Sequence, residues 1–431
     1  MTDWPVMTDP TPRTAPTHAP MAQFPANHQG ELLVGGVPLS QLAARVGQTP
    51  FFAYDRSLLR ARVAQLRTAL PAAVKLHYAM KANPMPAVVQ FMAGLVEGID
   101  VASAGELKVA LDAGADPNEV SFAGPGKRDP ELLQAVAAGV LVNVESMREL
   151  PVLAAAAQHL GLPARVAVRV NPDFELKGSG MKMGGGPKQF GVDTEVVPEM
   201  LAFIAGEAAS GLAFEGFHLF AGSQNLKTES ICEAQIKSYE LALRLAGDAP
   251  SGLPPVQFLN LGGGFGIPYF PGERPLDLVP IGLNLHSILE RMARELPAAH
   301  VVIELGRYLV GEAGVYVSRI VDRKVSRGQV YLVADGGLHH HLAASGNFGQ
   351  VVRKNYPATV QPQGARTGTA EHEVASVVGP LCTPLDLLAD RMAMPRGEVG
   401  DLAVVFQSGA YGASSSPQGF LGHPAVVEVL V

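Results

Sequence analysis

The sequence predicts an α/β protein made of a closed (β/α)₈ barrel followed by a β-rich domain. Apolar, strand-like runs alternate with helical patterns from about residue 50 to about residue 310, and eight such runs occur. Eight strands, each followed by a helix or a loop leading to one, are the parts of a closed barrel. After Gly311, short β-rich runs separated by Gly and Pro replace this alternation and indicate a second domain. A doubly wound open sheet is the alternative, because eight strands do not exclude it.

The expected barrel strands, in chain order, are VKLHYAM, GIDVAS, VSFAG, LVNVES, ARVAVRV, FEGFHLFAG, VQFLNLGGG and HVVIEL. Between them lie helical patterns such as GELKVALDAGA and DPELLQAVAAG. A short strand between Glu31 and Gly35 has no helix to pair it with the barrel, so we assign it to the β-domain. The expected segments are a disordered Pro/Thr/Ala-rich tail (1–28), a strand and helix that join the β-domain (29–48), the barrel (49–310) and the C-terminal β-domain (311–431).

The composition argues against several classes of partner. The chain has 431 residues, of which 17% are charged, a formal net charge of −7 and no run of Lys or Arg. Neither nucleic acid nor a membrane surface is therefore expected as a partner. Only two cysteines occur, Cys232 and Cys382, which argues against a disulfide framework. Because the sequence shows no long apolar stretch and no signal-peptide pattern, we expect a cytoplasmic protein.

Candidate functional residues directly follow the expected strands, since the βα loops of a barrel build the face that carries function. Lys81, in HYAMKANP, follows the first strand. Partial burial at the barrel mouth lowers the pKa of an amine, which can then form an imine with an aldehyde cofactor. From this position alone, a solvated loop lysine is the simpler interpretation.

Two further runs offer groups for a phosphate. LNLGGGFG places Gly262, Gly263 and Gly264 at the end of the seventh strand, where backbone N–H groups can approach an anion. IELGRY places Glu304 and Arg307 after the eighth strand. The guanidinium suits a phosphate, and a carboxylate facing the barrel axis can keep a pyridine nitrogen protonated. A tight turn and a structural ion pair are the alternatives.

The sixth strand and the C-terminal part add three more candidates. FHLFAGSQN places Ser223 in a turn of small residues, where its hydroxyl can donate to a phosphate, whereas His218 lies inside the strand and is expected to be structural. Cys382, in VGPLCTPLD, is most simply a core residue, and Tyr411, in SGAYG, a turn residue or a phosphate donor. An imine lysine, a ring-nitrogen acid and a phosphate cup together meet the requirements of pyridoxal phosphate.

From about Pro50 onwards the chain resembles the fold-type III pyridoxal-phosphate-dependent decarboxylases, the family of diaminopimelate, ornithine and arginine decarboxylases. The runs that carry the resemblance are YAMKAN, GIDVASAGEL, FAGPGKRDPEL, NVESMREL, RVNP, GSQ, LGGGFGIPY, ELGRYLV, VGPLC and GAYG. The resemblance implies an alanine-racemase-like barrel with a β-domain that also takes the N-terminal strand. It further implies an amino-acid decarboxylase that works as a homodimer with shared active sites.

By resemblance, each candidate receives a role. Lys81 is the lysine that binds the cofactor, and Glu304 is the partner of its ring nitrogen. Cys382 matches a cysteine that reaches the active site from the other subunit and is the expected proton donor to Cα after carbon dioxide has left. The phosphate-binding positions fall on Ser223, Gly262, Gly263, Gly264, Arg307 and Tyr411.

Four positions bear on the substrate. Diaminopimelate decarboxylases carry an acidic residue directly after the cysteine to bind a distal ammonium group, and this chain has Thr383 there. Asp386 matches a later aspartate of that motif and is expected to bind substrate. Ala343 and Asn347 fall where the same enzymes carry an Arg and a Tyr for the distal carboxylate. Because a buried charge without a partner costs roughly several kcal/mol, these changes argue against free diaminopimelate.

The runs DGGLHHHLAASGNFGQ and CTP are similar to a subgroup of the family. That subgroup includes a decarboxylase of glutamate linked to an acyl carrier protein, and decarboxylases associated with exosortase and exopolysaccharide loci. An L-amino acid or a carrier-linked aminoacyl group is therefore the expected substrate. The alternatives are a diaminopimelate decarboxylase proper, a racemase and a non-catalytic relative that binds pyridoxal phosphate. Glu304 and Cys382 speak against a racemase, which would carry an arginine and a tyrosine in those roles.

Two departures concern the cofactor site. Phe220 replaces the histidine that the family usually places under the cofactor ring, so stacking is retained but a proton-carrying role is lost. Leu305 replaces a proline and is expected to be tolerated. The consecutive histidines 339–341 look like metal ligands, but three neighbours on a strand cannot all point at one ion, and no metal is expected.

Overall fold

The computed structural model of the chain describes residues 16–175, 181–182, 184–206, 211–364 and 371–431. These residues form two compact units. The barrel unit contains the described residues of 56–268 and 273–312, and the β-unit contains the described residues up to Asp55 together with those of 269–272 and 313–431.

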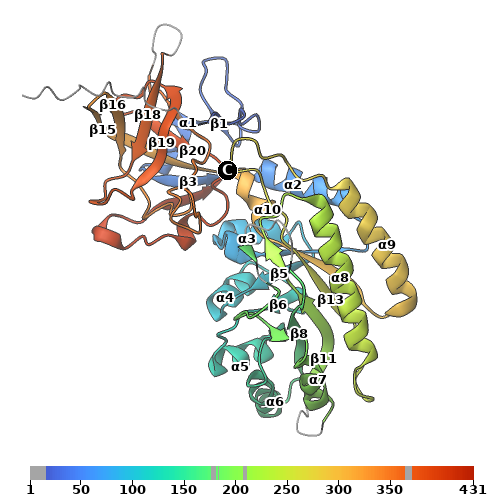
Figure 1. The fold of residues 1–431 in the computed structure, drawn as a ribbon. Helices are drawn as coiled ribbons and strands as arrows, with labels where there is room; N and C mark the ends of the chain where they lie inside the picture. Colours follow the sequence, from blue (N-terminus) through green and yellow to red (C-terminus); the bar gives the residue numbers. More distant parts are fainter. Residues whose placement is uncertain (1–15, 176–180, 183, 207–210, 365–370) are drawn as a thin grey trace, which may run out of the picture. The chain divides into compact units, whose positions relative to one another are not determined.

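The barrel unit contains eight parallel strands that close on themselves (Figure 1). In the order in which they pair, they are β4 (Lys75–Ala79), β5 (Gly98–Val101), β6 (Val120–Phe122), β7 (Leu141–Val144), β8 (Ala164–Asn171), β11 (Leu212–Leu219), β13 (Phe258–Gly263) and β14 (His300–Leu305). The pairing of β14 with β4 closes the ring. The eight predicted strands and the closed barrel are confirmed.

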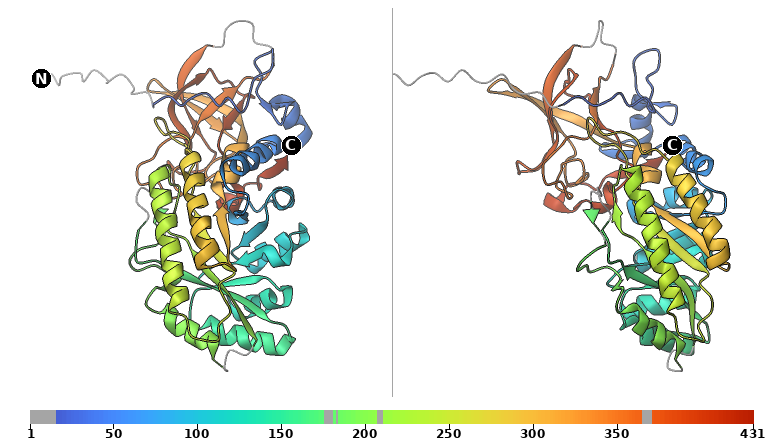
Figure 2. Two further views of the ribbon diagram at one scale, coloured as in Figure 1. Left: turned by 90° about the vertical axis from the view of Figure 1, so that its right-hand side faces the viewer. Right: turned by 45° about the vertical axis from the view of Figure 1, so that its right-hand side comes forward.

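Helices cover the outside of the barrel, and in two further views α8 and α9 run side by side (Figure 2). Their amphipathic sequences explain this position, because residues such as Ile231 and Tyr239 of α8 are fully buried while its polar face is not. The helices are α2 (Arg56–Ala69), α3 (Pro86–Ala93), α4 (Ala104–Asp112), α5 (Asp129–Ala138), α6 (Glu149–Leu160), α7 (Val197–Ala205), α8 (Thr228–Gly247), α9 (Val279–Glu295) and α10 (Arg307–Val310). Among the described residues, every helix is too short or too polar to span a bilayer.

The β-unit is built around a mostly antiparallel sheet, as predicted. Its strands are β17 (Ala358–Gln361), β20 (Leu402–Val405), β15 (Gly314–Ser326), β16 (Gln329–Ala334), β18 (His372–Val378), β19 (Leu387–Pro395), β3 (Phe51–Tyr54) and β21 (Val427–Leu430). β3 pairs with β15 and β21, so an N-terminal strand does join this sheet. The unit also contains helix α1 (Leu39–Val46).

The N-terminal strand of the sheet is not the one expected. The run near Glu31 forms only a hairpin between β1 (Leu33–Val34) and β2 (Val37–Pro38). The sheet instead takes β3, which we had assigned to the barrel. All four residues of β3 are buried, and the hydroxyl of Tyr54 donates to Glu428 at 2.6 Å. A short, wholly apolar run carries no mark of the sheet to which it belongs, which explains the error.

The expected disordered tail lies partly outside the described residues, which begin at residue 16. Residues 16–28 contain no helix, but Phe24 is buried and its ring centroid lies 5.7 Å from that of Phe406. This part of the segment therefore packs on the β-unit.

Candidate active site

Lys81 lies in the turn that follows β4, at the mouth of the barrel. Its side chain is 46% exposed, and Nζ lies 3.8 Å from Oε1 of Glu304, the residue next to the end of β14. The two strands are neighbours in the ring, so their ends meet there. Gly306 allows the close approach, because a Cβ at this position would lie 3.0 Å from that of Ala82.

Glu304 is a buried carboxylate with three basic side chains around it. Its side chain is 7% exposed, and Oε2 lies 3.1 Å from Nε2 of His218 in β11. Burial by itself raises the pKa of Glu304, but His218, Lys81 and Arg169 outweigh it and hold this pKa well below its ordinary value. The mouth of the barrel therefore presents a buried carboxylate of lowered pKa beside a lysine amine.

The glycine turn after β13 packs directly against the turn that contains Ser223. Gly262 and Gly264 have φ values of +68° and +70°, which favour glycine. A Cβ on Gly264 would lie 2.2 Å from the carbonyl oxygen of Gly222, and the backbone N–H of Asn225 donates to the carbonyl oxygen of Gly264. The turn that carries Ser223 and the backbone of the glycine turn are thus brought together, as a phosphate cup requires.

Arg307 and Phe220 complete the part of the site that the barrel unit supplies. Arg307 is the first residue of α10, directly after β14, the strand that pairs with β13. Phe220 follows β11, and Nζ of Lys81 lies 5.8 Å from the centroid of its ring. An aromatic face beside the lysine suits a planar cofactor ring.

Sequence reasoning missed several buried charges at the same end of the barrel. Glu145, just after β7, accepts from Nη1 of Arg169 at 2.7 Å and from the backbone N–H of Gly191 at 2.9 Å. Lys127 lies 3.1 Å from Glu149, and both are buried. The rule that identified Lys81, position at or after a strand end, would have identified Arg169 and Glu145 as well.

The remaining predicted site residues belong to the β-unit. Cys382 is exposed and Thr383 is partly buried. Tyr411 has a φ of +53°, and its ring centroid lies 5.9 Å from that of Phe348. Asn347 donates from Nδ2 to Oγ of Ser345 at 2.8 Å.

Asp386 lies in a different environment from the one expected of a substrate-binding residue. It is 3% exposed, and its two carboxylate oxygens accept from the backbone N–H groups of Leu338 at 2.6 Å and Leu381 at 2.8 Å. A carboxylate that is buried and bonded to the backbone of its own unit supports the loop before Cys382.

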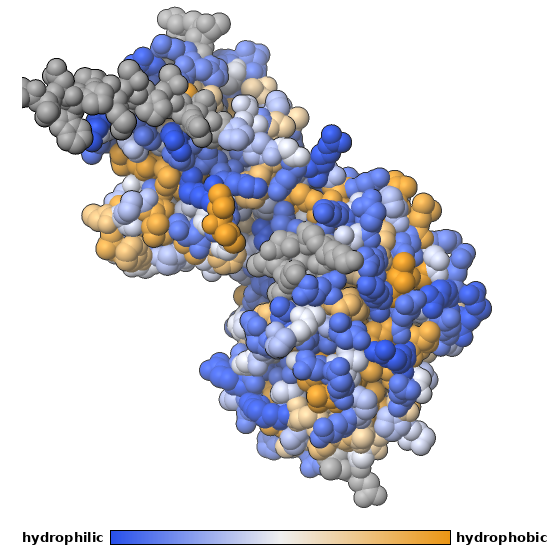
Figure 3. Space-filling model, viewed as in Figure 1, coloured by the Kyte–Doolittle hydropathy of each residue, from blue (hydrophilic) through white to orange (hydrophobic). Residues whose placement is uncertain are grey.

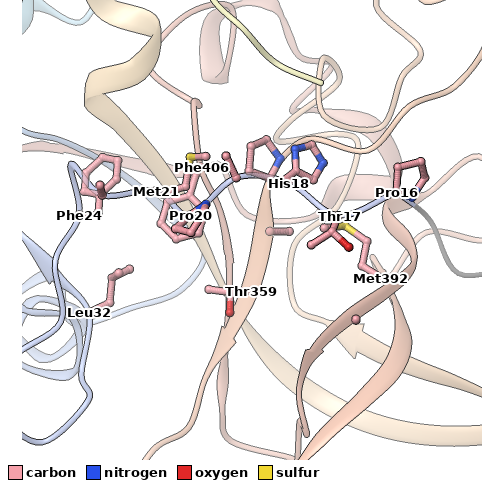
Figure 4. Close-up of a pocket in the computed structure, with 15 residues that line it drawn as sticks. Pro16, Thr17, His18, Pro20, Met21, Phe24, Leu32, Thr359, Met392 and Phe406 are labelled. Atoms are coloured by element: carbon pink, nitrogen blue, oxygen red, sulfur yellow. The ribbon is translucent and has the colours of Figure 1, made fainter. Parts of the chain in front are cut away.

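Two other features of the β-unit carry no catalytic group. The cavity shown in Figure 4, of about 430 Å³, is lined by residues 16–22 together with side chains that include Leu32, Met392 and Phe406, and His18 is its one titratable residue. Two of the three consecutive histidines have separate partners: Nε2 of His340 lies 2.8 Å from the carbonyl oxygen of Pro424, and Nε2 of His341 lies 2.9 Å from Oγ of Ser408.

The barrel and these side chains define a class of enzyme, the barrel enzymes that hold pyridoxal phosphate on a lysine. The residues present fit this cofactor: a half-exposed amine lies beside a buried, ionised carboxylate, and a close-packed glycine turn lies against a serine turn.

Comparisons with known proteins agree with this class. The family model described as "Pyridoxal-dependent decarboxylase, pyridoxal binding domain" matches residues 56–311. L-glutamyl-[BtrI acyl-carrier protein] decarboxylase of Niallia circulans is 38% identical over 89% of each chain. Diaminopimelate decarboxylase of Aquifex aeolicus is 33% identical over 93% of this chain and 91% of its own. The structure of Helicobacter pylori diaminopimelate decarboxylase with L-lysine matches at 27% identity and a TM-score of 0.78, over 91% of this chain and 94% of that one.

The chain therefore belongs to the pyridoxal-dependent decarboxylases. It is a carboxy-lyase that uses pyridoxal phosphate, and the predicted fold, cofactor and class of enzyme are confirmed.

Proposed function

We propose that the enzyme removes the α-carboxylate of an L-amino acid or a carrier-linked aminoacyl group whose far end is uncharged or extends out of the pocket. One observation carries this proposal: the loop after Cys382 offers no acidic group to a distal ammonium. Thr383 occupies the position of the acid, and both carboxylate oxygens of Asp386 accept from backbone N–H groups.

The two positions that would bind a distal carboxylate, residues 343 and 347, support the same conclusion. Ala343 is buried and has no polar side-chain atom, and the amide of Asn347 is engaged with Ser345 and with the carbonyl oxygen of Leu385. A distal carboxylate would therefore lose its water without gaining a cation, at a cost of roughly several kcal/mol. The relation to a decarboxylase of a carrier-linked glutamyl group, at 38% identity, supports a substrate of that kind.

In this proposal the residues of the barrel unit hold the cofactor. Lys81 binds it covalently, Glu304 keeps the proton on its ring nitrogen, and Phe220 covers its ring. Ser223, Arg307 and the glycines 262–264 bind its phosphate, and Tyr411 of the β-unit is the one further phosphate ligand of the proposal. When bound, pyridoxal phosphate supplies a ring that accepts the electron pair left as the bond between Cα and the carboxylate breaks. Cys382 then delivers a proton to Cα.

The proposal includes a homodimer in which Cys382 of one subunit serves the site of the other. Large apolar side chains are exposed on the β-unit, among them Leu385, next but one to Thr383, and Phe348, beside Tyr411. Hydrophobic residues, in orange, are visible on the surface of this unit (Figure 3). A second copy would cover such a surface. A cytoplasmic location and a role in exopolysaccharide assembly are part of the same proposal.

Mixing two inactive variants tests the shared site. Lys81→Ala and Cys382→Ala each remove one contribution, so random exchange of subunits should restore about one quarter of the wild-type activity, because half of the dimers regain one of their two sites. Each variant mixed with itself is the control. Mixtures as inactive as the separate variants would exclude a shared site.

Substrate choice is tested by incubating the holoenzyme with free diaminopimelate and, separately, with glutamyl carrier protein, and measuring carbon dioxide release. We expect release from the carrier-linked substrate. Thr383→Glu should raise kcat/KM for diaminopimelate about tenfold, because one modest charge pair with the distal ammonium is worth about that much. Ser326→Glu, which adds the same charge elsewhere in the β-unit, is the control and should leave kcat/KM unchanged. Rapid release from diaminopimelate by the wild type would identify a diaminopimelate decarboxylase proper, and inversion at Cα without release would identify a racemase.

A further inference from the structure

We propose that His218 is a positioning residue that fixes the carboxylate of Glu304, so that one oxygen is held by the protein and the other is left for the ring nitrogen of the cofactor. The inference deepens the proposed function and rests on the role given there to Glu304. Sequence reasoning assigned His218 no part in the site, and its position in the structure is the reason to reconsider it.

The geometry separates the two oxygens of Glu304. Oε2 lies 3.1 Å from Nε2 of His218, an ion-pair distance, while Oε1 lies 3.8 Å from Nζ of Lys81. His218 is 2% exposed and lies in β11, and Glu304 is the fifth residue of β14, so both groups are carried by strands rather than by loops. A carboxylate held at one oxygen by a strand residue cannot rotate freely, so its second oxygen keeps a defined direction.

A buried carboxylate also needs a permanent partner. Lys81 cannot be that partner throughout the reaction, because the proposal commits its amine to the cofactor. Arg169 is already paired with Glu145 at 2.7 Å and acts on Glu304 only through its charge. His218 is the close neighbour, at 3.1 Å, that has no other assigned task, and its contact is the foremost of the effects that lower the pKa of Glu304.

The alternation of a strand links His218 to the change at Phe220. Side chains two residues apart in a strand point to the same side, and Phe220 directly follows β11, two residues after His218. The phenyl ring of Phe220 has no titratable proton that it could exchange with the cofactor. The imidazole that contacts Glu304 would therefore act on the cofactor ring through that carboxylate.

The test compares His218→Leu, His218→Gln and Glu304→Gln as holoenzymes, with His300→Gln as the control for losing a partly buried histidine elsewhere in the barrel unit. The readout is the ¹⁵N chemical shift of the ring nitrogen in labelled pyridoxal phosphate bound to each protein. We expect the nitrogen to be protonated in the wild type and in His300→Gln, and to lose this proton, wholly or partly, in Glu304→Gln and His218→Leu. His218→Gln, which retains a donor, should recover much of the wild-type shift.

The kinetic constants provide a second readout. His218→Leu should lower kcat about tenfold to a hundredfold, the range that supporting hydrogen bonds to an active-site ligand are worth. KM should stay within about twofold of the wild-type value, because His218 does not contact the substrate. An equal loss in His218→Gln and His218→Leu would indicate a packing role and overturn the inference.

The experiment distinguishes failure of the role proposed for Glu304 from failure of the role inferred for His218. If Glu304→Gln leaves the ring nitrogen protonated, the role of Glu304 is wrong and the inference falls with it. If Glu304→Gln removes the proton and His218→Leu does not, only the inference is wrong. Should His218→Leu not fold, the ¹⁵N shift of Nε2 in wild-type His218 decides: a protonated Nε2 supports the inference, and an unprotonated one overturns it.

Discussion

The backbone N–H of Leu381, the residue before Cys382, donates to Oδ2 of Asp386 at 2.8 Å. The other carboxylate oxygen accepts from Leu338, so Asp386 joins the turn after β16 to the loop that carries the cysteine. A Cβ on Gly337 or Gly379 would lie 2.1 or 2.3 Å from this carboxylate, which explains why both turns contain glycine. Burial raises the pKa of Asp386, so the carboxylate is retained at an electrostatic cost.

Asp386→Ala should therefore destabilise the enzyme and lower kcat. Two buried N–H groups would lose their acceptors, at about 1–3 kcal/mol each, and the loop before Cys382 would lose its support. Urea unfolding of the full chain measures the loss. Asp386→Asn, which retains one acceptor, should lose less, and Glu371→Gln, on the exposed surface of the same unit, should lose almost nothing. A stable Asp386→Ala with a raised KM alone would restore the substrate-binding role.

Gly264→Ala should impair cofactor binding more than any single phosphate contact would. Its Cβ would lie 2.2 Å from the carbonyl oxygen of Gly222, at a φ of +70° that L residues rarely adopt. We expect a loss of about 2–4 kcal/mol in stability and a visible loss of bound pyridoxal phosphate by absorbance. Gly247→Ala, at the end of α8 with open space around it, is the matched control and should be neutral. Full retention of cofactor in Gly264→Ala would argue against this turn as the phosphate site.

Strand periodicity and the strand-end rule predicted much of the molecule, for identifiable reasons. Parallel barrel strands are buried on both faces, so each is a clear apolar run, and all eight were found. Lys81 and Glu304 follow or end such runs, and they lie 3.8 Å apart. The rule could not indicate that His218 contacts Glu304, because a histidine inside a strand looks the same whether its partner is structural or functional.

Long-range contacts account for the misplaced strand and for the environment of Asp386. Phe51–Tyr54 joins a sheet whose other members lie more than 250 residues further along the chain, and a four-residue apolar run contains no information about such partners. Asp386 was assigned to the substrate by motif position. One of its carboxylate oxygens accepts from the backbone N–H of Leu338, 48 residues earlier in the chain. No local sequence pattern reveals such a distant partner.

His77 should make the barrel unit less stable at alkaline pH. Burial lowers the pKa of this imidazole, but Asp100, 3.0 Å away, and Glu119 outweigh it and raise the pKa to about 9, above the ordinary value of 6.5. The stabilisation is complete below pH 6.5 and is lost as the pH rises to 9, at about 1.4 kcal/mol per pH unit. The stability advantage of the wild type over His77→Gln should therefore shrink by about 3 kcal/mol across this range. The same comparison with the exposed His159→Gln should show no trend, and a constant gap for His77→Gln would contradict the prediction.

His341 should make the β-unit less stable at acidic pH. It is fully buried, and burial alone lowers its pKa to about 3. Nδ1 accepts from the backbone N–H of Ala344 and Nε2 lies 2.9 Å from Oγ of Ser408, an arrangement that suits the neutral ring. Since the unfolded chain takes up this proton near pH 6.5 and the folded chain does not, stability falls as the pH drops from 6.5 towards 3, by about 1.4 kcal/mol per pH unit.

The measurement is the free energy of unfolding of wild type and His341→Phe between pH 6.5 and 4.5. Phenylalanine fits among the rings of Phe52, Tyr316 and Tyr356 but does not titrate. Any advantage of the wild type at pH 6.5 should decrease by about 3 kcal/mol at pH 4.5, because only the wild type must exclude the proton. His372→Gln, at an exposed histidine of the same unit, should keep a constant difference from the wild type. A wild type that keeps its full advantage over His341→Phe at pH 4.5 would mean that the folded protein protonates His341 without strain, and that this histidine is not held neutral.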